Sequence, residues 1–303
     1  MQKSFKIAAL TTLCATTFAA HAQMTMDANL ELDTTYQNKV KAPATNARDS
    51  DLNMGGRVEF NVGAKATNGD AFVQGRGTLL LKKDGDSSVD DMWVQFGNAG
   101  MDVKVGRFEA MDLFPVGKDT VLEEAGYSAY KANKLRGRFG KDSAHGALGI
   151  NAGAARIELG LVYSKEKGEA RGFRPAVSFG SGPVTVRVGA ESVKVVGASK
   201  STNGFGASVG YALSADSSIN VNFAKMEDDQ SVGINAVFGA AGIGFINGKG
   251  ATSAQKVNTV YAAYSLPLFN VKGATVTPAL SYSKGGTGTD SQLAARVRLN
   301  YAF

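Results

Sequence analysis

Apolar and polar side chains alternate along most of this chain with a period of two residues. Residues 290–303 show the pattern most regularly: one face carries Leu293, Ala295, Val297, Leu299, Tyr301 and Phe303, and the other carries Gln292, Ala294, Arg296, Arg298, Asn300 and Ala302. Such alternation predicts a β-strand with one apolar and one polar face. In water this strand would form half of a small sheet. In a bilayer it would form one stave of a closed barrel, apolar outside and wet inside.

Similar segments recur along the rest of the sequence, and no stretch of helical period is visible. We expect strands at 26–37, 52–64, 71–81, 89–97, 101–108, 156–164, 173–179, 184–195, 205–211, 219–224, 232–238, 242–247, 257–266, 274–282 and 290–303. One more strand is expected between 109 and 152, where the segments 134–139 and 145–151 combine into a single descending strand. Sixteen strands are therefore predicted.

The connectors separate into two lengths, and this separation favours a barrel. Tight turns are expected at 97–100, 180–183, 214–217 and 239–242, with longer polar links at 165–172, 197–203, 225–231, 248–255 and 284–290. Short turns at one end and longer loops at the other are typical of outer-membrane barrels. We predict an all-β fold, a transmembrane antiparallel β-barrel of about sixteen strands.

The start of the chain and its composition agree with this prediction. Lys3 and Lys6 precede a mostly apolar stretch, and Ala20-His21-Ala22 is an A-x-A cleavage site. We expect a secretory signal peptide at 1–22 and a transmembrane barrel domain at 23–303. Mean hydropathy is −0.10 and no long apolar run follows the expected signal, which excludes a helical membrane protein. Composition alone also fits a soluble secreted all-β protein.

Residues 106–140 form the longest interruption of the strand pattern. They read GRFEAMDLFPVGKDTVLEEAGYSAYKANKLRGRFG. Here the chain resembles the general diffusion porins of Gram-negative outer membranes, whose fifth strand ends in a Gly-Arg pair (here Gly106-Arg107) before a third loop folds inward. The phrase FEAMDLFPVGKD is similar to the raffinose-type glycoporin branch. The resemblance implies a homotrimer in the cell outer membrane. It also implies Phe303 as the assembly signal read by the barrel assembly machinery.

Charges of opposite sign are expected to face each other across the lumen. Five acidic candidates lie on the loop: Glu109, Asp112, Asp119, Glu123 and Glu124. Seven basic candidates are assigned to the wall: Arg57, Arg76, Lys104, Arg107, Lys134, Arg136 and Arg138. Arg107 shares parity with outward-facing Val105, so its place at the pore rests on the resemblance. We also expect Glu31 and Asp33 to meet Arg296 and Arg298 where the barrel closes.

These features predict a water-filled channel for passive diffusion of small hydrophilic solutes, with a weak anion preference. A carbohydrate-preferring glycoporin is the alternative, with Phe114, Tyr127 and Tyr130 as candidate sugar contacts. The expected partners are outer-membrane lipid, small ions and hydrophilic solutes, with no nucleic acid and no cofactor.

Two rival classes remain open. A barrel enzyme would need a nucleophile and a base, and Ser143 lies two residues before His145. We expect no enzyme, because no orienting acid or amide stands beside this pair. We expect no metal site either, because no paired His or Cys spacing exists. A structural or adhesive barrel is the other rival, and the long loop argues against it.

Overall fold

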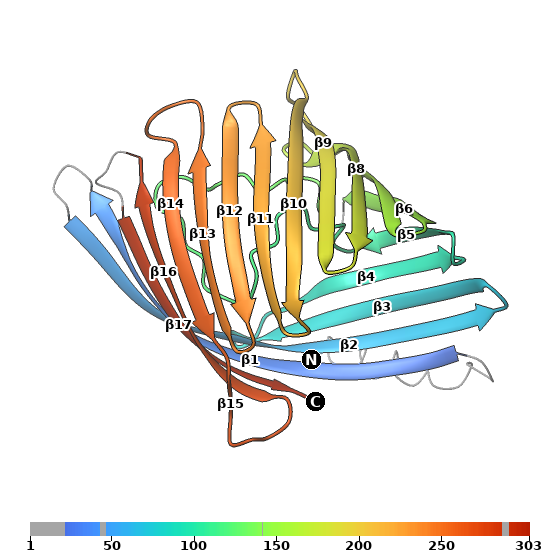
Figure 1. Cartoon of the computed structure of the whole chain (residues 1–303), viewed down its shortest axis with the longest axis horizontal. Helices are drawn as coiled ribbons and strands as arrows, with labels where there is room; N and C mark the ends of the chain where they lie inside the picture. Colours follow the sequence, from blue (N-terminus) through green and yellow to red (C-terminus); the bar gives the residue numbers. More distant parts are fainter. Residues whose placement is uncertain (1–21, 43–46, 141, 287–290) are drawn as a thin grey trace, which may run out of the picture.

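The chain folds into one closed antiparallel barrel (Figure 1). The computed structural model describes residues 22–42, 47–140, 142–286 and 291–303. Each strand pairs with its neighbours in sequence, and the first strand also pairs with the last, which closes the sheet. Closure gives the first and the last strand a partner on each side, as a strand structure in lipid requires. The expected signal peptide lies outside the described residues except for Ala22.

Seventeen strand segments build this sheet. They are β1 Ala22–Ala42, β2 Ala47–Asn68, β3 Ala71–Lys82, β4 Ser87–Gly97, β5 Met101–Arg107, β6 Ser143–Ala152, β7 Ala155–Ser164, β8 Ala170–Ser181, β9 Val184–Val195, β10 Thr202–Ser214, β11 Ser217–Met226, β12 Asp229–Phe238, β13 Ala241–Lys249, β14 Lys256–Tyr264, β15 Leu266–Pro267, β16 Ala274–Gly285 and β17 Ser291–Ala302. The two-residue β15 continues β14 after Ser265, and both pair with β16. Counted as one stave, they give the sixteen-stranded barrel that the alternation predicted, which is confirmed.

Large apolar side chains cover the outside of the barrel. Many of the outward positions along the strands carry exposed large hydrophobic side chains, for example Met54, Val94, Phe205, Ile234 and Leu280. An apolar surface of this extent fits lipid and does not fit water. No helix among the described residues is long and apolar enough to cross a membrane.

The closing seam between β1 and β17 is held by charge as well as by the strand ladder. Arg298 forms two 2.7 Å hydrogen bonds with Asp33, and its Nη1 lies 3.3 Å from Glu31. The expected pairing across the seam is confirmed for Arg298. Arg296 instead reaches Asp119. Two backbone hydrogen bonds join Phe303 to Ala28 at the end of this seam; its role as an assembly signal stays a prediction.

Connector lengths follow the expected separation with two exceptions, the link expected at 225–231 and the link 268–273 between β15 and β16, which is long although it lies at the turn end. Two-residue turns join β2 to β3, β6 to β7, β8 to β9, β10 to β11 and β12 to β13, all at the end of the barrel where β1 begins. The prediction of a long link at 225–231 is wrong, because only two residues, Glu227 and Asp228, connect β11 to β12. Glu227 adopts a positive φ of 51°, which permits this tight reversal.

The long excursion differs from its prediction in one respect. A single strand, β6, does descend between residues 109 and 152, but it begins at Ser143 and does not contain 134–139. Gly137 (φ 142°) and Arg138 (φ 56°) break the extended backbone there. Leu135 is buried inside the barrel and does not face lipid. The alternation at 134–139 therefore arose in a loop.

Candidate functional site

Residues 108–140, between β5 and β6, fold into the barrel and are called the inward loop here. Gly106 marks the point where the chain leaves the wall: its φ is 123°, and a β-carbon there would collide with the carbonyl oxygen of Met92. Phe108 turns inside and is almost fully buried. Figure 1 shows the loop in green, crossing behind β10–β14.

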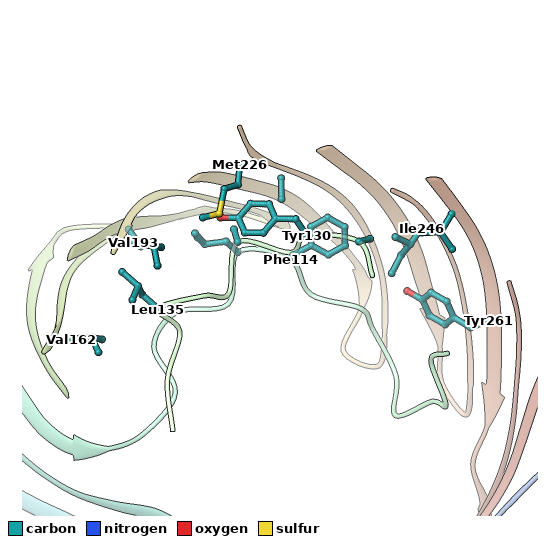
Figure 2. Close-up of a cluster of buried hydrophobic side chains, with 14 residues drawn as sticks. Phe114, Tyr130, Leu135, Val162, Val193, Met226, Ile246 and Tyr261 are labelled. Carbon is teal, nitrogen blue, oxygen red and sulfur yellow. The ribbon is translucent and has the colours of Figure 1, made fainter. Parts of the chain in front are cut away.

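The inward loop lies on an apolar patch of the inner wall. Loop side chains such as Leu113, Phe114, Tyr130 and Leu135 form one cluster with wall side chains from β7 to β14: Val162, Ala176, Val193, Ala224, Met226, Ile246, Val257 and Tyr261. Figure 2 shows Tyr130 beside Met226 and Leu135 between Val162 and Val193. Burial of these side chains holds the loop against one side of the lumen.

Inward-facing glycines make room for this close contact. A β-carbon on Gly206 would stand 2.5 Å from Cβ of Ala132, and one on Gly233 would stand 2.8 Å from the Phe114 ring. In the same way, a β-carbon on Gly189 would stand 2.7 Å from the Leu113 side chain, and one on Gly248 would stand 2.6 Å from Cβ of Ala129. Any larger residue would push the loop toward the centre of the barrel. These glycines, on β9, β10, β12 and β13, therefore set how close the loop lies to the wall.

A buried carboxylate fastens the returning half of the loop. Glu191 of β9 accepts hydrogen bonds from the Tyr130 hydroxyl and from the backbone N–H groups of Lys134 and Leu135 (3.2 and 3.0 Å). Arg174 of β8 lies 3.8 Å from Glu191 and also donates to the carbonyl of Met111 at 2.8 Å. Burial, and then the hydrogen bond to Glu191, raise the pKa of the Tyr130 hydroxyl, so it remains a donor.

The tip of the loop has its own polar contacts. The Pro115 carbonyl accepts hydrogen bonds from Asn222 (2.8 Å) and Asn235 (2.7 Å) on the inner wall. Asp119 reaches across to β17, where it pairs with Arg296 and Arg298, both at 2.9 Å. The loop is thus tied to the wall at both halves.

The inner face of β2 and β3, which the loop does not cover, stays open to the lumen. Arg57 pairs with Glu31 (3.1 Å) and Glu59 (3.6 Å), and Arg76 lies 3.9 Å from Glu59. The two arginine side chains are 40% and 41% exposed, whereas Glu31 and Glu59 are only 10% and 18% exposed. The guanidinium groups therefore stand toward the lumen with the carboxylates behind them.

The remaining loop charges pair mostly with one another. Arg136 contacts Glu109 (3.1 Å) and Asp112 (3.7 Å), while Lys131 contacts Glu124 at 3.0 Å. Glu123 accepts a 2.8 Å hydrogen bond from Gln37 of β1.

Arg138 joins the loop to the wall on the other side. It bridges Asp90 (3.2 Å), Asp91 (3.1 Å) and Glu109 (3.3 Å). Burial lowers its pKa, but the hydrogen bond to Asp91 and the surrounding carboxylates outweigh burial and raise it overall. This arginine therefore stays charged.

Four of the seven basic candidates lie elsewhere than expected: Arg107, and the three loop residues Lys134, Arg136 and Arg138, which were assigned to a wall strand. Arg107 sits in the wall itself, where its Nε donates to the Asp90 carbonyl (2.7 Å) and its Nη1 donates to the Phe139 carbonyl (2.6 Å). Lys104 faces inward, but its ammonium lies over the rings of Trp93 (3.9 Å) and Phe108 (4.7 Å). Lys134 is exposed on the loop and not on a strand.

The three candidate sugar contacts, Phe114, Tyr127 and Tyr130, make contacts that hold the inward loop in place. Phe114 and Tyr130 are only 3% and 5% exposed within the apolar cluster, so neither ring face is free to stack on a sugar. The Tyr127 hydroxyl donates to Asp229 at 2.7 Å. Burial and this hydrogen bond raise the Tyr127 pKa. These three side chains anchor the loop.

The alternation of apolar and polar residues could not identify Glu191 and Arg174 as the residues that hold the inward loop. Both occupy inward positions on their strands, as do the charges that line the open lumen. The inward glycines of β9–β13 were the sequence signal for this contact, because several inward positions without a side chain on one wall indicate that another segment packs against that wall.

Three comparisons with known proteins bear on this arrangement. A family model described as "Porin-like glycoporin RafY" matches residues 18–143, less than half of the chain. No curated protein matches. A loop-deletion mutant of OmpT, an outer membrane protein of Vibrio cholerae, is 15% identical with a TM-score of 0.63, covering 93% of this chain and 100% of that one. A triple mutant of the Rhodopseudomonas blastica porin is 10% identical with a TM-score of 0.63, covering 92% and 100%. The expected resemblance to outer-membrane porins is confirmed.

Replacing Glu191 with Ala should loosen the inward loop, because the Tyr130 hydroxyl and two backbone N–H groups would lose their acceptor and buried Arg174 would keep only Glu158 as a carboxylate partner. Removal of one member of a buried ion pair typically costs about 3–5 kcal/mol. Hydrogen–deuterium exchange at the amides of Lys134 and Leu135 should accelerate by at least about a hundredfold. Glu169→Ala, at an exposed carboxylate in the β7–β8 link, is the matched control. Wild-type exchange rates in the Glu191 variant would contradict this role.

Proposed function

We propose that this chain, which has the fold of the outer-membrane porins, forms a water-filled channel for passive diffusion of small hydrophilic solutes. The observation that carries the proposal is the inward loop. It is fixed to the inner wall of β7–β14 and leaves the charged inner face of β2 and β3 open. A lumen narrowed on one side by a pinned loop admits small solutes and excludes large ones. The polar lining disfavours apolar solutes.

A weak anion preference follows from the exposure of the lining charges. Arg57 and Arg76 project into the lumen farther than the carboxylates that pair with them. An anion therefore meets positive charge first, although the nearby carboxylates offset most of it. Two charges about 8 Å apart interact by only about 2 kcal/mol at an effective dielectric of 20. Such a channel biases permeation and does not gate it.

Carbohydrate passage is the second candidate, favoured by the glycoporin family model. The buried rings of Phe114 and Tyr130 supply no stacking surface, so sugar contact would depend mainly on hydrogen bonds. A recess of about 420 Å³ between the loop and β1–β2 offers both donors and acceptors, from Thr35, Gln37, Asn53, Glu123 and Arg296. Such a lining matches a polyhydroxylated solute.

The setting of the channel is part of the proposal. The apolar outer belt and the porin fold support a place in the outer membrane of a Gram-negative cell, reached by a signal peptide and the barrel assembly machinery. Assembly as a homotrimer is proposed from the resemblance to the diffusion porins.

The channel activity can be measured directly. The folded chain, added to a planar lipid bilayer, should produce stepwise ohmic currents, and liposomes containing it should swell in small sugars. The same protein unfolded by boiling is the control. A folded barrel that inserts into the bilayer but carries no current would contradict the proposed channel function.

Ion preference can be tested at the loop. Changing Arg136 and Arg138 to Gln removes two positive charges and leaves Glu109, Asp112 and Asp91 without these partners. Each charge is worth on the order of 0.5–1 kcal/mol at partly screened range. The anion-to-cation ratio, read from reversal potentials, should fall roughly five- to thirtyfold at low salt and less at high salt.

The matched control neutralises Lys165 and Lys167, which are exposed in the β7–β8 link. An unmoved reversal potential in the Arg136/Arg138 variant would place these arginines off the ion path.

A further inference from the structure

A row of basic side chains crosses the outer face of the barrel at its loop end, which is the end opposite to the one where β1 begins and the upper end of β8–β14 in Figure 1. Each of these residues is one of the two residues at the loop end of its strand. Together they are called the basic row: Arg171 of β8, Lys194 of β9, Lys225 of β11, Lys249 of β13, Lys256 of β14 and Lys284 of β16. The row therefore lies at the edge of the apolar outer belt.

Strand register turns these side chains outward. Val193 and Val257 are buried inside the barrel against the inward loop, so their neighbours Lys194 and Lys256 point to the opposite face. Lys249 is the direct cross-strand partner of Lys256 and therefore shares its face.

Lys225 and Lys284 face outward for the same reason. Lys225 is the cross-strand partner of Phe205, whose ring is exposed on the outer surface. Lys284 follows exposed Tyr282 by two residues on β16, so both side chains lie on one face.

Four members of the basic row stand directly opposite another cation. Lys249 is paired with Lys256, and Arg171 is paired with Lys194, which places Arg171 on the outer face as well. Direct partners have their β-carbons about 4.5–5.5 Å apart, and like charges at this spacing repel. The ion pairs among the described residues include none of the six basic side chains. An anion between two such cations would turn the repulsion into attraction.

A shallow groove adjoins the row at β7–β9. Its volume is about 420 Å³, and Arg171 and Lys194 line it together with Leu161, Tyr163 and Phe173. The last three side chains are large, apolar or aromatic, and exposed on the outer surface. Paired cations beside such a groove fit a molecule that has an anionic head and an acyl chain.

The turn end of the same strands has a different lining. Its outward positions carry exposed aromatic rings, among them Phe179, Tyr211, Phe238 and Tyr264. Within the described parts of β8–β14, Lys or Arg does not point outward at that end. Aromatic girdles of this kind mark a membrane–water interface. The two rims thus differ in charge, so the basic row suits an anionic leaflet at the loop end only.

We propose that the basic row binds phosphate-bearing lipids of the leaflet at the loop end. One phosphate lies between Arg171 and Lys194, and a second lies between Lys249 and Lys256. An acyl chain of the first lipid lies along Leu161. The inference rests on the membrane setting proposed above, and it does not depend on conduction through the lumen.

The chemistry of the surface selects this occupant. A free phosphate would leave the apolar groove uncovered, and a zwitterionic lipid would bring its own ammonium group among the cations. A lipid with a net negative headgroup satisfies both the cations and the groove. Clusters of Lys and Arg at a membrane surface recognise anionic lipids in this way.

Native mass spectrometry of the folded full chain in detergent tests the surface. Phosphatidylglycerol and phosphatidylcholine with identical acyl chains are the probes, because both carry a phosphate but only the former has a net negative charge. The wild-type protein should bind phosphatidylglycerol at least about tenfold more tightly than phosphatidylcholine. An excess of inorganic phosphate should leave the bound phosphatidylglycerol in place.

Matched variants locate the binding. Arg171→Gln and Lys194→Gln, combined with Lys249→Gln and Lys256→Gln, should reduce phosphatidylglycerol affinity about tenfold, to the level of phosphatidylcholine. These side chains lie on the outer surface, so the barrel should still fold, which heat-modifiable migration in a gel verifies. Lys165→Gln with Lys167→Gln, at exposed lysines in the β7–β8 link, should retain the wild-type affinity.

Four results would overturn the proposal. They are equal binding of the two lipids by the wild type, undiminished phosphatidylglycerol binding by the folded fourfold variant, an equal loss in the Lys165/Lys167 control, and displacement of the lipid by inorganic phosphate. Lipid binding is measured without a current, so its failure is distinct from failure of the channel. A barrel that conducts but does not distinguish the lipids would reject only this inference.

Discussion

The lumen of this barrel depends on the buried ion pair between Arg174 and Glu191. A sixteen-stranded barrel left empty would be a wide hole, so its selectivity must come from what is folded inside. Glu191 gathers the Tyr130 hydroxyl and two backbone amides of the inward loop, while Arg174 holds the Met111 carbonyl on the outgoing half. Arg174 lies 3.8 Å from both Glu191 and Glu158, whereas Glu191 has Arg174 as its one ion-pair partner among the described residues, so removal of Arg174 would leave the buried Glu191 charge uncompensated. The position of the loop is therefore a consequence of electrostatics as much as of packing.

Hydrophobic burial and glycine placement explain why the loop lies on one side. The inner faces of β7–β14 carry small and apolar residues, including Gly206 and Gly233, where the loop comes close enough to exclude a β-carbon. The inner faces of β2 and β3 carry arginines, carboxylates and amides that remain hydrated. A loop with an apolar underside and acidic tip residues can bury the first and pair the second in one arrangement only. Its underside meets the glycine-lined wall, and Asp119 reaches Arg296 and Arg298.

Much of this structure could be predicted from alternation alone. Each strand has one face that tolerates lipid and one that does not, so the count of sixteen, the closing seam at Asp33 and Arg298, and the lumen-facing position of Arg57 all followed from period-two reasoning. The pattern failed at Lys134, Arg136 and Arg138, because a loop can alternate by chance and only burial of Leu135 reveals the difference. Other expectations failed for other reasons: the resemblance put Arg107 at the pore, but it lies in the wall, and the candidate sugar contacts Phe114 and Tyr130 are buried under the loop. Alternation says which way a strand residue points, but it does not say what covers that residue inside the barrel.

The place of the inward loop against the inner wall is the claim on which the proposed channel rests. A disulfide tests it most directly, since a β-carbon on Gly117 would lie 3.5 Å from Cβ of Asn235, within the range that disulfides span. The only native cysteine, Cys14, falls in the expected signal peptide. A Gly117→Cys, Asn235→Cys protein should crosslink under mild oxidant in the assembled barrel and keep its single-channel conductance. Gly117→Cys with Asn258→Cys, which faces outward on β14, should not crosslink. Free thiols at positions 117 and 235 after oxidation of the folded barrel, or a conductance that changes when they are bridged, would contradict this position of the loop.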